Sequence, residues 1–249
     1  MKVLVCIKRV PDTGGGFRLT ADGKRVDTTN LGFTISPHEE CAVEEAIRII
    51  EKHGGSSTVL TLGPAAAQEQ LREALAKGIN NAILLEADDY ESWDPKAVAH
   101  AIAETVKPMG FDLLLFGNES ADACNYQVGL RVAYLLDLPC VSGIKALEIQ
   151  NGKAIAKRES SEGWEVYEVS LPAVFTVKEG INVPRHPSLR GIMAAKKIPI
   201  EQRKPARGDS PIARRRLKKP QEGRQLEILG QGVEAVGKVV AKLRELGAI

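Results

Sequence analysis

The chain has 249 residues, enough for one large domain or two small domains with buried cores. Its apolar fraction of 43% is typical of a globular protein, and no apolar run approaches the roughly 18 residues of a membrane-spanning helix. The four cysteines are widely spaced without a CxxC pair, which argues against a zinc site and against a disulfide scaffold. The net charge of +2 is unevenly spread, because residues 196–220 hold ten Lys or Arg against two Asp or Glu.

The first half of the chain alternates short apolar runs with amphipathic segments. Predicted strands cover residues 2–7, 58–62, 82–85 and 111–116, and predicted helices begin after Ser36, at Gly63-Pro64, after Asp94 and near residue 125. A serine or aspartate before proline indicates a helix start, because the side chain caps free N–H groups and proline fits the first position. Such alternation predicts a doubly wound, mostly parallel sheet covered on both faces. The first strand reaches a lysine too early for a signal peptide, so we expect a cytoplasmic protein.

The pattern changes after Pro139. Four strand-like runs between residues 144 and 177, with turns at Asn151-Gly152 and Glu162-Gly163, predict an antiparallel meander. Residues 198–225 are basic and proline-rich, which predicts an extended arm, and residues 232–246 have apolar side chains at helical spacing. The predicted fold class is therefore α/β, a doubly wound mostly parallel sheet with an added meander and a C-terminal extended arm ending in a helix. The predicted division is residues 1–195 and residues 196–249, the second part docking on a partner.

Ligands of an open α/β sheet bind beyond the carboxyl ends of its strands, at the point where strand order reverses. Four such places qualify here, namely Cys6–Arg9, Ser36–Glu39, Leu62–Pro64 and Gly117–Gly129. The last is the richest, because a glycine leaves a strand and polar residues follow. A helix is expected to begin between Cys124 and Gln127, and its free N–H groups would suit a phosphate. Asp122 has two interpretations: it accepts hydrogen bonds from a sugar hydroxyl or an adenine amine, or it only caps the helix.

Other chemistries lack their motifs. The chain has no GxGxxG, GxxxxGK[ST], HExxH or GxSxG sequence, and its four histidines are scattered. Metal sites and catalytic triads are therefore not supported, although His38 could face a ligand at a helix start. The basic run at residues 214–219 has no interleaved aromatic side chains, which argues against nucleic-acid binding.

Residues 182–197, which we call the docking loop, contain two prolines and a leucine at a position where loops usually have polar residues. Pro184 and Pro187 restrict the backbone, and residues 192–195 can form about one helical turn. Leu189 is a large apolar side chain among turn formers and arginines. Either the loop presents Leu189 to a partner protein, or Leu189 folds back into its own core.

Several short motifs occur in an order that resembles one known family, the beta (small) subunit of electron-transfer flavoproteins. The resemblance covers nearly the whole chain. Its motifs are Val3–Val10, Ala42–Ala46, Gly63-Pro64-Ala65, Leu75–Gly78, Gly117–Gly129, Leu171–Val174 and Pro184–Lys197.

This resemblance implies an electron carrier rather than an enzyme. In the family, the beta subunit pairs with a larger alpha subunit, and FAD lies at their interface. The heterodimer accepts electrons from dehydrogenases such as the acyl-CoA dehydrogenases of fatty acid oxidation and passes them to a quinone-linked oxidoreductase. The beta subunit binds AMP structurally, and the basic arm and last helix would wrap the alpha subunit.

The resemblance also assigns residues. The AMP pocket matches Cys6, Ser36, Pro37, His38, Glu39, Leu62, Gly117, Asn118, Glu119, Ser120, Ala121, Asp122, Ala123, Cys124, Asn125, Tyr126, Gln127 and Val128. The surface that docks dehydrogenases matches Pro187, Leu189, Arg190, Ile192 and Met193, with Leu189 as the anchor.

The sequence departs from the family pattern near the cofactors. Asp122 alone remains of an aspartate-rich run, and two aromatic residues that approach the flavin in mitochondrial members fall at His38 and Thr13. Electron-bifurcating members bind a second FAD in place of AMP, but their Gly-Asp-Thr at 123–125 is absent, so AMP is favoured. The further alternative is a flavin-free adenine-nucleotide-binding regulatory module, against which the meander, docking loop and arm argue.

Overall fold

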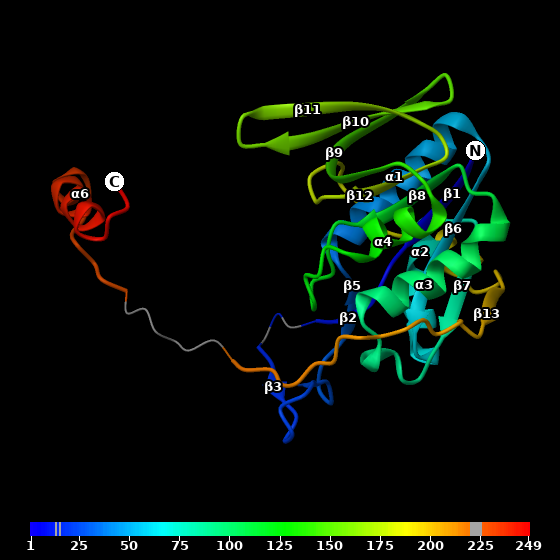
Figure 1. Ribbon diagram of the computed structural model, residues 1–249, viewed down its shortest axis with the longest axis horizontal. Coiled ribbons are helices and arrows are strands. Elements are labelled where there is room, and N and C mark those ends of the chain that lie inside the picture. The colour runs from blue at the N-terminus through cyan, green and yellow to red at the C-terminus, as the bar shows by residue number, and fades with distance from the viewer. Residues whose placement is uncertain (13, 15, 220–225) are drawn as a thin grey trace. The chain divides into compact units, whose positions relative to one another are not determined.

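The computed structural model describes residues 1–12, 14, 16–219 and 226–249 (Figure 1). Two compact units are formed, Met1–Arg216 and Leu217–Ile249. The strands of the main sheet are β1 (Lys2–Cys6), β6 (Ser56–Gly63), β7 (Asn81–Glu86), β8 (Leu113–Gly117), β9 (Cys140–Gln150), β10 (Lys153–Ser160), β11 (Gly163–Ser170), β12 (Ala173–Val177) and β13 (Ile200–Arg203). Two small antiparallel sheets pair β2 (Arg9–Pro11) with β5 (Phe33–Ile35) and β3 (Arg18–Leu19) with β4 (Val26–Asp27).

The helices are short to medium in length. They are α1 (Pro37–His53), α2 (Gln68–Lys77), α3 (Pro95–Val106), α4 (Val128–Leu136), α5 (Leu189–Ala195) and α6 (Val236–Glu245), with 3-10 turns η1 (Ala65–Ala67), η2 (Tyr90–Ser92), η3 (Lys107–Met109) and η4 (Val233–Ala235). Within the described part of the chain, no helix is long and apolar enough to cross a membrane.

Local capping explains where α1 and α3 begin. The Glu39 carboxylate accepts a hydrogen bond from the Ser36 N–H at 3.3 Å, and the Asp94 carboxylate accepts one from the Ala97 N–H at 2.9 Å. Pro37 and Pro95 occupy the first helical positions, where no N–H is needed. These two predicted helix starts are confirmed.

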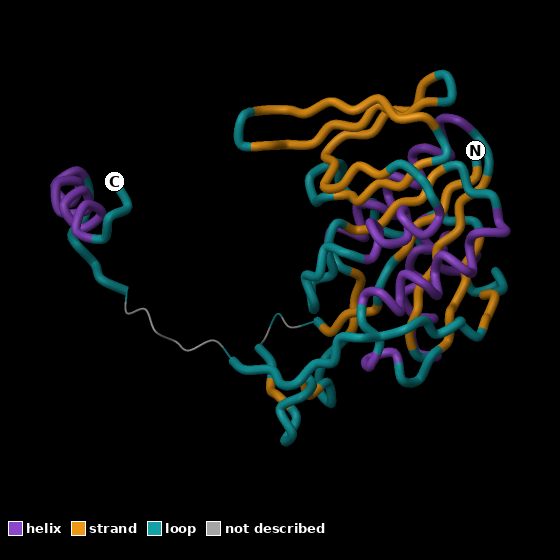
Figure 2. Tube along the Cα trace, in the orientation of Figure 1, coloured by secondary structure: helices purple, strands orange, loops and turns teal. Residues whose placement is uncertain are grey.

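The main sheet has the strand order β11-β10-β9-β12-β8-β1-β6-β7-β13. Its two faces bury separate cores, since Val3 and Val5 pack with α1 and α2 whereas Leu4 packs with α3 and α4. Figure 2 shows the helices of the first unit gathered about the strands of this sheet. Successive side chains of a strand point to opposite faces, so a central strand buried on both faces reads as a continuous apolar run. The predicted doubly wound α/β architecture is confirmed.

The predicted four-stranded meander is partly wrong. Strands β9, β10 and β11 are antiparallel neighbours as expected. The fourth strand, β12, instead lies between β8 and β9 and runs parallel to both, with Phe175 opposite Leu115 and Val141. All five side chains of β12 are buried, as a central position requires.

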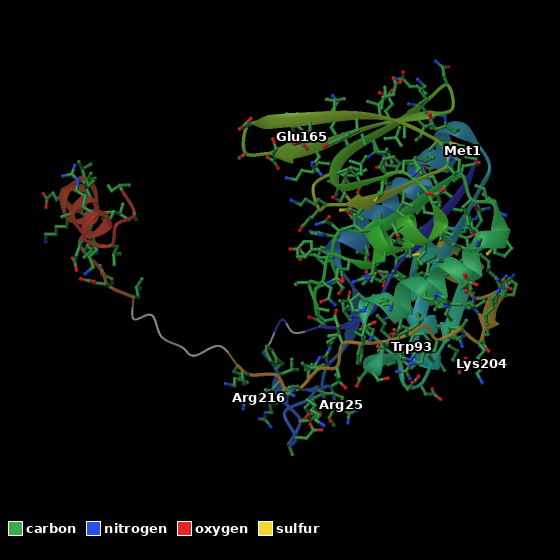
Figure 3. The ribbon with its side chains drawn as sticks, in the orientation of Figure 1. Met1, Arg25, Trp93, Glu165, Lys204 and Arg216 are labelled. Carbon is green, nitrogen blue, oxygen red and sulfur yellow. The ribbon has the colours of Figure 1, made fainter. Side chains whose placement is uncertain are left out.

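The segment predicted as an extended arm contains a strand. Ile200–Arg203 forms β13, which pairs in parallel with β7 at the edge of the sheet. Beyond it, the Arg207 guanidinium lies over the Trp93 ring at 5.3 Å and pairs with Asp89 at 2.5 Å. Figure 3 labels Trp93 and also Lys204, the first residue after β13. The Ile212 N–H donates to the Asp94 carboxylate at 3.2 Å. This part of the segment therefore packs on the start of α3 and belongs to the first unit.

The second unit contains α6, which confirms a helix near the C-terminus. Its apolar side chains are exposed within this unit, among them Val233, Val236 and Leu246. Part of the predicted arm, residues 220–225, lies outside the described residues. The predicted division of the chain into residues 1–195 and 196–249 stays a prediction, because it assumes that the second part docks on another subunit.

Candidate functional site

The strand order reverses between β1 and β8. From β1 the sheet continues through β6 and β7 in one direction, and from β8 through β12 in the other. Connections from adjacent parallel strands then diverge and leave a crevice at the carboxyl ends, where α/β proteins bind ligands. Lys8 follows β1 and residues 118–127 follow β8, so the predicted nucleotide segment lies at this switch point.

An ion pair joins the two sides of the switch point. Lys8 Nζ lies 2.7 Å from Asp122 Oδ1 and 2.6 Å from Oδ2. Asp122 does not cap α4, which begins only at Val128. The capping interpretation of Asp122 is therefore wrong, and its carboxylate instead pairs with Lys8 at the switch point. The sequence pointed to Lys8 only as part of the end of the first strand, Cys6–Arg9, and not as an individual site residue.

The start of α1 ties three segments together. The buried Glu39 carboxylate accepts hydrogen bonds from the backbone N–H groups of Lys8, at 3.0 Å, and of Ser36. The Ser36 hydroxyl accepts a hydrogen bond from the Ala121 N–H at 3.0 Å. Residues from the ends of β1 and β8 are thus fixed to one helix start.

Glu39 is a buried acid in this arrangement. Burial raises the pKa of its carboxyl group to about 8, against the opposing effect of the two backbone N–H donors and the Lys8 charge. Gly117 leaves room for it, because a Cβ at Gly117 would lie 2.6 Å from Glu39 Cγ. Only a glycine fits there without moving the glutamate.

The loop before α4 differs from the prediction. The helix was expected to begin between Cys124 and Gln127, but it begins at Val128. Cys124 and Tyr126 adopt positive φ angles of 48° and 56°, which interrupt a helix. The first N–H groups of α4 lack intrahelical partners and are available to an anion.

His38 lies at the same edge of the sheet. Its Nδ1 is buried without a hydrogen bond and lies 3.9 Å from Glu119 Oε1. Arg9 Nε, which follows β1, and Thr61 Oγ1, near the end of β6, are also buried without partners. Buried polar atoms usually have partners, and His38 Nδ1 is the one of these three atoms that belongs to a predicted pocket residue.

The predicted pocket residues do not all face this crevice. The Cys6 side chain is buried in the core beneath α3 and α4, and burial raises the pKa of its thiol well above the ordinary value. Leu62 packs against the same core. Asn118 Oδ1 accepts from the Thr176 hydroxyl at 2.8 Å and so is directed towards β12.

The remaining pocket residues surround the loop. Gln127 accepts hydrogen bonds from Arg131, while Pro37, Asn125 and Tyr126 are exposed. Ser120 O accepts hydrogen bonds from the Ala123 and Cys124 N–H groups, which closes a turn. Thr13 lies outside the described residues.

The donor set of the switch point suits a nucleotide rather than a metal ion. Lys8 and the N–H groups of α4 can bind a phosphate, and Asp122 and Glu119 can accept from hydroxyl or amino groups. Among the described residues, no three His, Cys, Asp or Glu side chains gather to hold a metal ion.

The docking loop exposes its leucine. Leu189 is 84% exposed at the start of α5, and Met193, one helical turn later, is 60% exposed. The Ser188 hydroxyl caps this short helix by accepting a hydrogen bond from the Gly191 N–H at 3.0 Å. The interpretation that Leu189 folds back into its own core is therefore wrong. Pro187, Arg190 and Ile192 lie on the same short segment.

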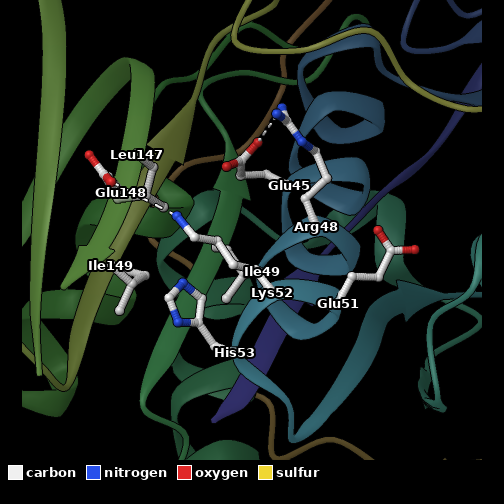
Figure 4. A pocket seen from close by; sticks show the side chains of 9 residues that line it. All are labelled: Glu45, Arg48, Ile49, Glu51, Lys52, His53, Leu147, Glu148 and Ile149. Atoms are coloured by element: carbon white, nitrogen blue, oxygen red, sulfur yellow. Dashed lines mark hydrogen bonds and ion pairs between the residues drawn. The ribbon is translucent and has the colours of Figure 1, made fainter. Parts of the chain in front are cut away.

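An open polar groove of about 450 Å³ lies at the other end of α1 (Figure 4). Lys52 reaches Glu148 at 3.9 Å, and Arg48 reaches Glu45 at 3.4 Å. No predicted site residue lines this groove, and it lies at the end of α1 opposite Ser36. The groove is therefore separate from the switch point.

Comparison with known proteins points to a single family. The family model described as the electron transfer flavoprotein domain matches residues 24–207. The electron transfer flavoprotein subunit beta of Syntrophomonas wolfei is 41% identical over 213 residues, which cover 85% of this chain and 83% of that protein. The Bacillus subtilis protein of the same name is 38% identical over 203 residues, covering 81% and 78%.

A eukaryotic relative agrees with the bacterial ones. The probable electron transfer flavoprotein subunit beta of Saccharomyces cerevisiae is 36% identical over 206 residues, covering 81% of this chain and 79% of that protein. All three names are those of electron-transfer subunits, as expected for a carrier rather than an enzyme. The chain therefore belongs to the electron transfer flavoprotein family, among its beta subunits.

Proposed function

We propose that this chain pairs with an electron transfer flavoprotein alpha subunit and that the heterodimer carries FAD at the subunit interface. It accepts electrons from flavin dehydrogenases, such as acyl-CoA dehydrogenases in fatty acid oxidation, and delivers them to a quinone-linked oxidoreductase. FAD supplies the redox chemistry when bound. This chain contributes the docking surface for the dehydrogenase and a structural nucleotide site.

The observation that carries this proposal is the exposed leucine of a fixed loop. A single exposed apolar side chain is common, but two on one face of a short helix that is fixed to its unit form an apolar surface that can dock a partner. Leu189 and Met193 form a small apolar surface in the middle of the docking loop. A small surface suits an electron carrier, because it gives a complex that dissociates quickly after each transfer.

The nucleotide at the switch point is proposed to be AMP. Lys8 and the start of α4 offer positive groups for one phosphate, and Asp122 offers an acceptor for the ribose or the adenine. When AMP binds, the ion pair between Lys8 and Asp122 would open, so that each side chain contacts the ligand. A second FAD at this place, as in electron-bifurcating relatives, is the alternative that the experiment below separates.

The test is a visible absorption spectrum of this chain copurified with its alpha subunit, followed by mass spectrometry of the released nucleotides. Flavin bands, with AMP and FAD in equal amounts, are expected. Two FAD molecules and no AMP would identify the bifurcating alternative. A heterodimer without flavin bands would contradict the proposal and favour the flavin-free nucleotide-binding module.

A further inference from the structure

The docking loop is held to α1 at its first end by an arginine. Arg185 Nε and Nη2 donate to the two carboxylate oxygens of Glu44, each at 2.9 Å, and Nη1 and Nη2 donate to Glu51 at 2.6 and 3.0 Å. The Arg185 backbone N–H also donates to Glu44 at 3.1 Å. A guanidinium that engages two carboxylates through paired donors fixes direction as well as distance.

Burial makes this contact more than a surface ion pair. The Glu44 side chain is only 7% exposed and the Arg185 side chain 34% exposed. The paired carboxylates raise the pKa of Arg185, so its charge is held at any working pH. Without Arg185, the buried Glu44 carboxylate would lose its partner, which is far less favourable than losing an exposed pair.

Asn182 adds a second fastening at the same end. Its Nδ2 donates to the Cys41 carbonyl at 3.0 Å and to the Glu45 carboxylate at 2.9 Å. Three carboxylates of α1 therefore bind the first residues of the docking loop: those of Glu44, Glu45 and Glu51.

The second end of the docking loop is held to α2. The Arg72 guanidinium donates to the carbonyl oxygens of Ala195, the last residue of α5, and of Ile198, three residues beyond it. In the middle of α5, a Cβ on Gly191 would lie 2.2 Å from the Ala76 carbonyl oxygen, so the two helices are in backbone contact there. Both ends of the segment that exposes Leu189 are thus clamped to different helices of one unit.

We infer that Arg185 and Arg72 are positioning residues that hold Leu189 in the geometry that a dehydrogenase binds. This inference rests on the proposed docking function and extends it to two residues that touch no partner. A loop held in one conformation binds with the full affinity of its contact surface. If the loop populates the binding conformation for only a fraction of the time, its observed affinity is the full affinity multiplied by that fraction.

The experiment uses the flavin-containing heterodimer and a reduced acyl-CoA dehydrogenase as the probe. Initial rates of flavin reduction at increasing dehydrogenase concentration give KM and kcat. Arg185→Met and Arg72→Met are each expected to raise KM about tenfold with kcat unchanged, because docking weakens but the docked complex is the same. Arg185→Lys keeps the charge without the paired donors, so its KM is expected to lie between that of Arg185→Met and that of the unmodified protein.

Two further measurements separate positioning from general stability. Hydrogen exchange of the amides at 188–195 should become faster in both clamp variants. In the double variant Leu189→Ala/Arg185→Met, KM should stay within about twofold of that of Leu189→Ala alone, because both changes act on one contact. The matched control is Lys52→Met, which removes an ion pair of α1 that does not touch the docking loop and should leave KM unchanged.

The contrary results are distinct. If Leu189→Ala raises KM but both clamp variants leave KM and loop exchange unchanged, the positioning inference is wrong and the docking function stands. An unchanged KM for Leu189→Ala would overturn the docking function, and this inference with it. If Arg185→Met does not fold, Arg185→Lys and Arg72→Met decide the question in the same way.

Discussion

A buried carboxylate at the switch point makes the stability of this chain depend on pH. The pKa of Glu39 is about 8 in the folded chain, above the ordinary value of 4.5. At pH values between these two pKa values, Glu39 keeps its proton in the folded chain and has lost it in the unfolded chain. The free energy of unfolding should therefore fall as pH rises through this window, by up to about 1.4 kcal/mol per pH unit from this one group.

The variant Glu39→Gln tests this linkage. It cannot ionise, so its free energy of unfolding should depend less on pH between 5 and 8 than that of the unmodified chain. Denaturant unfolding at several pH values measures both slopes. Identical slopes would show that Glu39 is not protonated in the folded chain.

The second prediction at this scale concerns Asp122. Its carboxylate pairs with Lys8 across the crevice, where we propose that AMP binds. Asp122→Ala should weaken nucleotide binding about tenfold, since a hydrogen bond to a charged group contributes about 1.5–3 kcal/mol. Nucleotide content per heterodimer is the measurement. Asp209→Ala, which removes the exposed partner of Lys96, is the control, and equal nucleotide content in both variants would contradict the assignment.

At the scale of elements, local signals predicted helices better than strand partners. The start of α1 depends on Ser36, Pro37 and Glu39, which are neighbours in sequence, so the sequence was sufficient. The position of β12 depends on pairing with β8 and β9, which are far from it in sequence. Its run, in which Thr176 alone is polar, was the signal of a central parallel strand, but the run follows a hairpin and so resembled the next strand of the meander.

Two other differences have equally specific causes. The start of α4 is delayed by positive φ angles at Cys124 and Tyr126, and residues other than glycine seldom adopt them. Strand β13 was missed because Ile200–Arg203 lies within a basic, proline-rich segment and gains its partner only from β7. Tertiary contacts, rather than intrinsic preference, decide both positions.

The close contact between α5 and α2 gives a prediction for Gly191. Alanine normally stabilises a helix relative to glycine by about 1 kcal/mol. Here the added Cβ would meet the Ala76 carbonyl oxygen, and such overpacking costs about 1–3 kcal/mol. Gly191→Ala should therefore lower the free energy of unfolding or shift α5, seen as faster amide exchange at 188–195. Gly32→Ala, whose Cβ would meet nothing within 4 Å, is the control, and equal behaviour of the two variants would contradict the contact.

At the scale of the whole molecule, the first unit holds the proposed nucleotide site and the proposed docking surface on one framework. The sheet brings residues 8, 36–39 and 117–128 together although they are distant in sequence. The location of this crevice could be predicted, because strand ends at a switch point follow from topology. The hydrogen bonds and ion pairs at this place could not be predicted. The ion pair of Lys8 with Asp122, for example, depends on side-chain distances that only the folded chain defines.

The central claim is that Leu189 docks a redox partner. Because it is 84% exposed, Leu189→Ala should change the free energy of unfolding by less than about 0.5 kcal/mol. An anchor residue typically contributes about 2 kcal/mol to binding, which corresponds to about a 30-fold change in affinity.

The direct measurement is the rate at which a reduced acyl-CoA dehydrogenase, below saturation, reduces the flavin of the heterodimer carrying Leu189→Ala. We predict a rate about 30-fold slower than that of the unmodified heterodimer, with FAD content and melting temperature unchanged. An unchanged rate, or a variant that loses FAD or melts early, would contradict the account.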